Sequence, residues 1–264
     1  MAIAFLFLYF LAFAAATTSH ASIPLEDLKT IHPLRPTATA TAGHPLPGID
    51  CLSWRLAVET DNIKNWDLVP ATCENYVGHY MLGMQYRHDC DVVADVAIKF
   101  AKTLRIPKDG RSIWVFDIDE TAFSNLPYYA GPDVAFGAKP YNATSFDEYA
   151  ATANVPALPA SLRLYQNLVK LGIKAVFITG SSTSLEKARI INLKRVGYYT
   201  WEKLVLKDSS DKRTSLVFKS EERTKLVAQG YRIVGNIGDQ WSDILGNNTG
   251  SRTFKLPDPM YYVA

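Results

Sequence analysis

Residues 111–129 read RSIWVFDIDETAFSNLPYY, in which an apolar run ends at two aspartates separated by one residue. The run at 113–116 is short and rich in β-branched and aromatic side chains, so we expect a buried strand there. Asp117 and Asp119 follow it directly. Because a buried carboxylate without a partner is costly, the pair needs a metal ion, a phosphate group or solvent beside it.

Strands and helices alternate after this stretch. Apolar runs predict three further strands, at 173–178, 204–206 and 233–237. Helices are expected between them: one on the face of Leu162 and Leu168 that stops near Gly172, one from a capping box at 183–186 to about Val196, and one at 221–229 that ends at Gly230. This order is typical of an α/β fold with a doubly wound parallel sheet.

The rest of the chain divides by composition. Its 264 residues suffice for one domain with a cap or for two small domains. We predict four parts: a signal peptide at 1–21, a loose arm rich in Pro, Thr and Ala at 22–50, a helical segment at 51–106, and a core at 107–264 with a small cap inserted at about 123–159. The net charge of +2 argues against a nucleic-acid partner.

The first residues predict that the chain enters the secretory pathway. Residues 2–16 are all apolar, and small residues before Ala21 suit cleavage there. An uncleaved membrane anchor is the alternative, but this run is shorter than the ~20 residues that span a bilayer. Two glycosylation sequons begin at Asn142 and Asn247. We therefore expect a glycoprotein outside the cell, in the cell wall or in the vacuole, with no stable membrane anchor.

Cys51, Cys73 and Cys90 all precede the quoted strand. In an oxidising compartment, three cysteines predict one disulfide and one spare thiol, and three pairings are open. Their spacing matches no zinc site.

Polar residues follow the predicted strands, where ligands bind in such sheets. Asp117 and Asp119 follow the first strand, Thr179 and Gly180 the second, and Asp239 and Asp243 the fourth, with Lys219 in the segment VFKSEER before it. A carboxylate nucleophile, a second carboxylate for proton transfer, a hydroxyl and an ammonium are the groups that phosphoryl transfer through a covalent intermediate requires. Mg²⁺ would separate the phosphate from the carboxylates. A calcium-binding EF-hand is excluded because Ala122 stands where that loop needs Gly.

The stretches FDIDET (116–121), FITG (177–180), FKS (218–220) and GDQWSD (238–243) resemble the motifs of the haloacid dehalogenase (HAD) superfamily. Within it, CLSWRLAVE (51–59), NLPYYA (125–130), VGNIGDQWSD (234–243) and KLPDPMYYV (255–263) are similar to the plant acid phosphatase and vegetative storage protein family. The resemblance implies an acid phosphatase that hydrolyses small phosphate monoesters at acidic pH, and a homodimer. It also leaves a storage protein as the alternative, although Asp117, which the best-known storage forms lack, is present here.

The resemblance also implies roles for single residues. Asp117 corresponds to the nucleophile and Asp119 to the general acid and base, while Thr179, Gly180 and Lys219 bind phosphate. The implied Mg²⁺ ligands are Asp117, the backbone carbonyl of Asp119 and Asp239, supported by Asp243.

Two further points concern the surroundings of the site. Tyr128, Tyr129 and Tyr141 could line the substrate entrance, although packing on the sheet is the simpler expectation for most of these aromatics. Family members often carry an arginine just after the motif at 179–180, whereas Ser181 and Ser182 stand here, which predicts weaker or altered activity.

Overall fold

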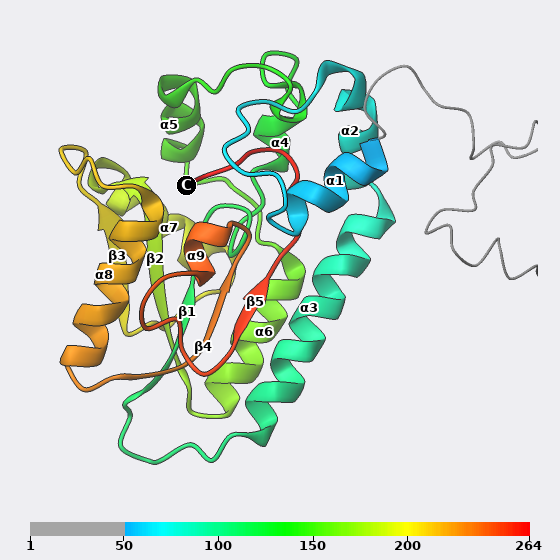
Figure 1. Cartoon of the computed structure of the whole chain (residues 1–264). Helices are drawn as coiled ribbons and strands as arrows, with labels where there is room; N and C mark the ends of the chain where they lie inside the picture. Colours follow the sequence, from blue (N-terminus) through cyan, green and yellow to red (C-terminus); the bar gives the residue numbers. More distant parts are fainter. Residues whose placement is uncertain (1–50) are drawn as a thin grey trace, which may run out of the picture. The chain divides into compact units, whose positions relative to one another are not determined.

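The computed structural model describes residues 51–264, so the predicted signal peptide (1–21) and arm (22–50) lie outside the described residues. Five parallel strands form one sheet in the order β3-β2-β1-β4-β5 (Figure 1). Their bounds are β1 Ser112–Phe116, β2 Lys174–Ser182, β3 Lys203–Lys207, β4 Arg232–Gly238 and β5 Thr253–Lys255. The α/β class with a parallel sheet is confirmed, and β5 is a strand that the sequence did not reveal.

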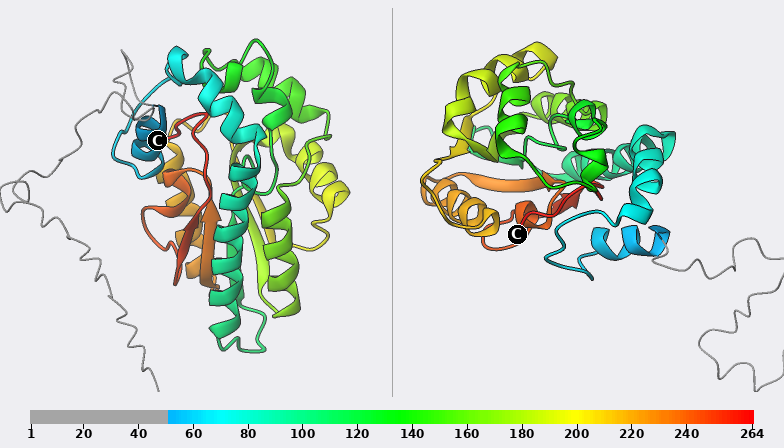
Figure 2. Two further views of the ribbon diagram at one scale, coloured as in Figure 1. Left: turned by 90° about the vertical axis from the view of Figure 1, so that its right-hand side faces the viewer. Right: turned by 90° about the horizontal axis from the view of Figure 1, so that it is seen from above.

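Helices cover both faces of the sheet (Figures 1 and 2). Successive side chains of β1 point to opposite faces, so Trp114 and Phe116 join the larger core and Ile113 and Val115 the smaller one. Two long helices, α3 (Met84–Thr103) and α6 (Pro159–Lys170), contribute to the larger core, and α8 (Ser215–Ala228) contributes to the smaller. Burial on both faces explains why β1 is apolar without alternation.

Two predicted helix starts are wrong. The capping box at 183–186 is absent: Ser182 instead caps a short 3₁₀ helix, η4 (Thr183–Leu185), and α7 (Glu186–Val196) follows. Helix α8 begins six residues before the predicted 221, because the hydroxyl of Thr214 accepts a hydrogen bond from the backbone N–H of Val217. Lys219 is therefore fixed in a helix rather than in a loop.

The segment 51–106 is helical but interrupted. It contains α1 (Cys51–Glu59), η2 (Ala71–Cys73), α2 (Glu74–Leu82) and α3. The helical segment is interrupted after α1 because Asp61 and Asn65 adopt positive φ angles of 62° and 53°, which a right-handed helix cannot contain. A disulfide joins Cys51 to Cys73 across this interruption, while Cys90 is free and buried.

The chain between β1 and α6 lies beyond the carboxyl ends of the strands (Figure 1). It contains α4 (Leu126–Tyr129), η3 (Ala135–Gly137) and α5 (Ala143–Ala151). An antiparallel bridge between Phe123 and Ala157 joins its two ends. The domain boundaries drawn from the sequence stay predictions. Within residues 51–264, we find no helix whose length and apolarity would let it cross a membrane.

Loss of the disulfide should destabilise the protein measurably. We expect Cys51→Ser to lower the free energy of unfolding by about 3 kcal/mol, since the bond closes a loop of 22 residues. Urea titration followed by circular dichroism measures the change.

The control is Cys90→Ser, which leaves the disulfide intact.

Burial raises the pKa of the Cys90 thiol to about 12, so a thiol reagent should label the folded wild type slowly and the unfolded protein at one cysteine. Rapid labelling of the folded protein would contradict the burial of the Cys90 thiol.

Candidate active site

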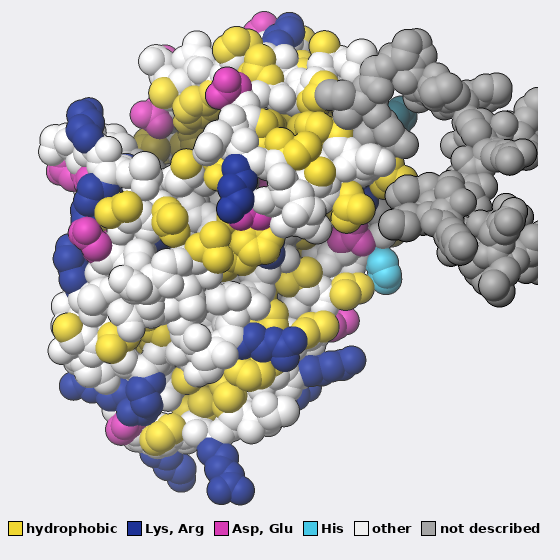
Figure 3. Space-filling view, viewed as in Figure 1, with side chains coloured by type: hydrophobic (Ala, Val, Ile, Leu, Met, Phe, Trp, Pro, Cys, Tyr) yellow, Lys and Arg dark blue, Asp and Glu magenta, His cyan; other side chains and the backbone are white. Residues whose placement is uncertain are grey.

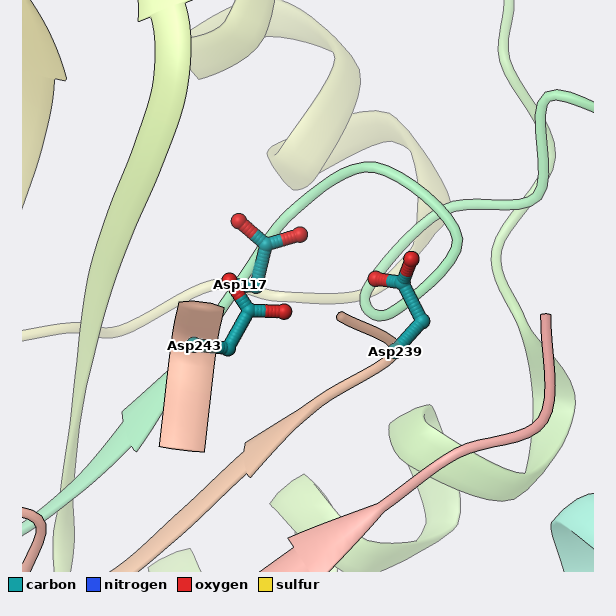
Figure 4. Close-up of side chains that lie close together, drawn as sticks. All are labelled: Asp117, Asp239 and Asp243. Carbon is teal, nitrogen blue, oxygen red and sulfur yellow. The ribbon is translucent and has the colours of Figure 1, made fainter. Parts of the chain in front are cut away.

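Three buried carboxylates converge at the carboxyl edge of the sheet (Figure 4). Asp117 follows β1, Asp239 follows β4, and Asp243 lies on the short helix α9 (Trp241–Ile244). One oxygen of each lies within 4.8 Å of the others. The sequence correctly places these three residues together.

Lys219 bridges two of the three carboxylates. Its ammonium lies 2.5 Å from Oδ1 of Asp117 and also contacts Oδ1 of Asp243. Burial of the ammonium lowers its pKa, but the two carboxylates outweigh this and raise the pKa of Lys219 above its ordinary value. Lys219 therefore remains a cation in the site.

Asp243 is held by bonds that also define α9. Its Oδ2 accepts a hydrogen bond of 2.9 Å from the backbone N–H of Gln240 in a capping box. Its backbone carbonyl accepts from Nδ2 of Asn236 at 2.8 Å and from Nη1 of Arg223 at 2.7 Å. A Cβ at Gly238 would overlap the Asp243 side chain, so this position requires glycine.

Asp239 is surrounded by donors and by other acids. Its oxygens accept from Thr121 Oγ1 at 2.8 Å, Gln240 Nε2 at 2.9 Å and Tyr261 O–H at 3.3 Å. Burial, followed by repulsion from Asp243, raises its pKa well above the ordinary value. The pKa of Asp117 is raised by burial and by neighbouring carboxylates, and Lys219 opposes this shift.

The donor set fits a divalent cation. Carboxylate oxygens are the ligands that Mg²⁺ and similar hard cations prefer. These three aspartates carry three negative formal charges and Lys219 carries one positive charge, so a dication would balance the excess of two. Such an ion would also relieve the repulsion that raises the pKa values of Asp117 and Asp239.

Thr179 and Gly180 lie at the end of the regular part of β2 and line the same cavity as Asp117 and Lys219. The hydroxyl oxygen of Thr179 accepts a hydrogen bond of 3.0 Å from the backbone N–H of Ser181. Its own proton is therefore left to donate to a phosphate oxygen.

Asp119 belongs to a second cluster, separate from the triad of Asp117, Asp239 and Asp243. Its side chain accepts hydrogen bonds from Asn125, Ser181 and Arg189. A metal contact by Asp119 thus concerns its backbone carbonyl only and stays a prediction. Ser181 stands where the resemblance leads us to expect an arginine. The guanidinium of Arg189, on α7, nevertheless contacts the Asp119 carboxylate.

A cavity of about 470 Å³ opens above both clusters. Tyr129 and Tyr141 line it, whereas Tyr128 packs against Tyr129, Phe146 and Tyr149, so the packing expectation holds for that residue. The C-terminal segment (residues 256–264) adds further walls: Met260, Tyr261, Tyr262 and Val263. On the face of the molecule that Figure 3 shows, which is the side seen in Figure 1, hydrophobic side chains gather on the upper part.

Sequence reasoning missed Arg189, Asn125 and the wall formed by the C-terminal segment. A signal for Arg189 existed: it shares a helical face with Leu185 and Leu193, both buried. The C-terminal segment carried no comparable signal, because it has no periodicity. The sequon asparagines Asn142 and Asn247 are exposed, and their glycosylation stays a prediction.

A methyl group at Gly238 should damage the site selectively. We expect Gly238→Ala to displace Asp243, destabilise the protein by about 1–3 kcal/mol through overpacking, and lower phosphate-ester turnover. Thermal unfolding and a steady-state assay measure both effects. Gly230→Ala is the control, because a Cβ there meets nothing within 4 Å, although its φ of 85° strains an alanine and Gly238 has no positive φ. Equal turnover in both variants would contradict the placement.

Two further buried acids, Glu120 and Asp258, should make stability depend on pH. The pKa of each is raised, chiefly by burial, and then by Asp239 for Glu120 and by Glu120 for Asp258. A raised folded-state pKa stabilises the fold below the ordinary carboxyl pKa, and this contribution is lost as pH rises through the folded value. Metal-free protein should therefore unfold at lower urea concentration at pH 7.5 than at pH 5, and Asp258→Asn should flatten this dependence. A wild type that is more stable at pH 7.5 would contradict it.

Comparison with known proteins agrees with this geometry. Residues 36–264 match the family described as HAD superfamily, subfamily IIIB (Acid phosphatase). The chain is 44% identical over 216 residues to Acid phosphatase 1 of Solanum lycopersicum, covering 81% of this chain and 84% of that protein. It is 39% identical over 259 residues to Vegetative storage protein 1 of Arabidopsis thaliana, covering 94% and 95%.

A solved structure shares the fold. The class C acid phosphatase from Bacillus anthracis superposes with a TM-score of 0.60 at 23% identity, covering 72% of this chain and 85% of that chain. The resemblance found in the sequence is thus confirmed, as is the prediction of a phosphomonoester hydrolase. The chain belongs to the acid phosphatases of the HAD superfamily, subfamily IIIB, whose superfamily generally uses the divalent metal that the buried carboxylates fit.

Proposed function

We propose that Asp117 is the nucleophile of a Mg²⁺-dependent acid phosphatase. One observation supports this assignment above the others: the Asp117 carboxylate ends the central strand beside Lys219 and the acids Asp239 and Asp243. An oxygen of Asp117 attacks phosphorus, forming the new P–O bond of an aspartyl phosphate as the bond to the ester oxygen breaks.

Asp119 completes both halves of the reaction. It donates a proton to the departing ester oxygen and then accepts one from the water that attacks phosphorus. This water breaks the bond to Asp117 and releases inorganic phosphate. Because the Asp119 side chain is 18% exposed whereas that of Asp117 is 7% exposed, Asp119 is the acid better placed to meet a leaving group or water in the cavity.

The remaining groups neutralise the phosphate. The Thr179 hydroxyl and the Lys219 ammonium donate to its oxygens, and the backbone at Gly180 borders the same space. Mg²⁺, held by Asp117, Asp239 and the carbonyl of Asp119 with Asp243 in support, would offset the charge between phosphate and carboxylates. The substrates are small phosphate monoesters.

We also place the protein in the secretory pathway, outside the cell or in the vacuole. The exposed sequons, the Cys51–Cys73 disulfide and the glycoprotein and storage-protein names of relatives in Glycine max and Arabidopsis thaliana support this location. The homodimer implied by the resemblance stays a prediction. Storage without catalysis is not favoured, because Asp117 is present and lies beside Lys219, Asp239 and Asp243.

The decisive experiment is hydrolysis of 4-nitrophenyl phosphate by wild type and by Asp117→Asn, with Mg²⁺ and after chelation. We expect Mg²⁺-dependent turnover in the wild type and a loss of at least about 10³-fold in the variant, because the covalent route is removed. The control is Asp133→Asn, an exposed acid outside the site. Equal, negligible rates in wild type and variant would favour storage instead.

A further inference from the structure

Arg189 is almost completely buried, at 1% exposure, beside the proposed general acid. Its Nη2 lies 2.8 Å from Oδ1 and 2.9 Å from Oδ2 of Asp119. Asp119 is the only carboxylate with which it forms a salt bridge within residues 51–264. A buried guanidinium is costly unless it is paired, so this contact stabilises both residues in one arrangement.

Two neutral groups complete the hold on the Asp119 carboxylate. Ser181 Oγ donates to Oδ2 of Asp119 at 2.9 Å and accepts from Nη2 of Arg189 at 2.8 Å. Asn125 Nδ2 donates to Oδ1 of Asp119 at 2.9 Å. The carboxylate therefore has donors on both oxygens, and its rotation about the side-chain bonds is restricted.

Comparison with Arg223, the other fully buried arginine within residues 51–264, shows what is unusual about Arg189. Arg223 donates to the backbone carbonyls of Asp243, Leu245 and Asn247, as expected for an arginine that stabilises loops. Arg189 has no hydrogen-bond partner in the described chain for either Nε or Nη1. Its polar contacts are confined to Asp119 and the serine between them, so its position serves the carboxylate rather than the backbone.

We propose that Arg189 is a positioning residue that orients the Asp119 carboxylate toward the leaving-group oxygen. The inference rests on the proposed function of Asp119. Arg189 keeps its own protons throughout. Asp119 takes up a proton from solvent, and this proton passes from Asp119 to the ester oxygen as the bond between that oxygen and phosphorus breaks. Without the guanidinium the carboxylate samples other rotamers, and fewer encounters lead to protonation.

The effect of the leaving group distinguishes this role from a structural one. An alkoxide needs a proton to depart, whereas 4-nitrophenolate is stable without one, so only the alkyl ester depends strongly on an oriented acid. We expect Arg189→Met to lower kcat/KM for glycerol 2-phosphate by about 10²-fold and kcat/KM for 4-nitrophenyl phosphate by less than about 10-fold. The value of kcat/KM is compared because it covers only the steps up to departure of the leaving group, whereas hydrolysis of the aspartyl phosphate is common to both esters. Arg189→Lys should restore part of the loss.

Two variants calibrate the ratio of these activities. Asp119→Asn should shift the ratio at least as far as Arg189→Met. Arg163→Met is the matched control, because it removes a surface arginine that bridges Asp91 and Asp95 and should leave the ratio unchanged. Circular dichroism confirms that each variant is folded.

Each outcome supports or overturns the positioning role of Arg189 or the proposed function. An equal loss on both esters in folded Arg189→Met would overturn the positioning role. If that variant does not fold, Arg189→Lys decides: a larger loss on the alkyl ester supports the role, and an unchanged ratio rejects it. Turnover retained in Asp117→Asn would instead reject the proposed function, whereas loss in Asp117→Asn with an unchanged ratio in the Arg189 variants rejects only the role of Arg189.

Discussion

The ion pairs that the Lys219 ammonium forms with Asp117 and Asp243 are the interactions on which the site depends. The ammonium lies between Asp117, at the end of the central strand, and Asp243, on a short helix after the neighbouring strand. Without this cation the three acids of the triad would repel one another in a buried place, and removing one partner from such a pair is strongly destabilising. The position of α8, fixed by its Thr214 cap, therefore determines whether the carboxylates can share one edge of the sheet.

The two aspartates of the opening stretch illustrate how environment assigns a role. Only Ile118 separates Asp117 from Asp119, yet their side chains lie in different clusters. Asp117 is paired with an ammonium among other acids, where the arrangement suits attack on phosphorus. Asp119 is oriented by a guanidinium and two neutral donors at the cavity wall, where it suits proton transfer. In the proposed mechanism, separating the two carboxyl groups in this way gives each its own chemistry.

Much of the fold and the triad could be predicted from the sequence, for a physical reason. Strands buried on both faces are continuous apolar runs, and parallel strands bring their carboxyl ends to one edge, so residues after these runs must meet. Asp117, Thr179 and Asp239 were found in this way. The start of α8 was missed because its cap lies in a charged stretch of sequence that is typical of solvent-exposed residues. Strand β5 was missed because its three residues are too few to show a hydrophobic pattern.

By itself, then, the sequence determined the α/β class, the family, and the identity of the acids and of Lys219, because these depend on local hydrophobic pattern and on motifs of a few residues. Tertiary structure alone decided the Cys51–Cys73 pairing, the wall formed by residues 256–264, and the delivery of Arg189 to Asp119 across 70 residues of chain. These contacts join segments that no periodicity relates, since their partners are selected by packing in three dimensions rather than by spacing along the chain.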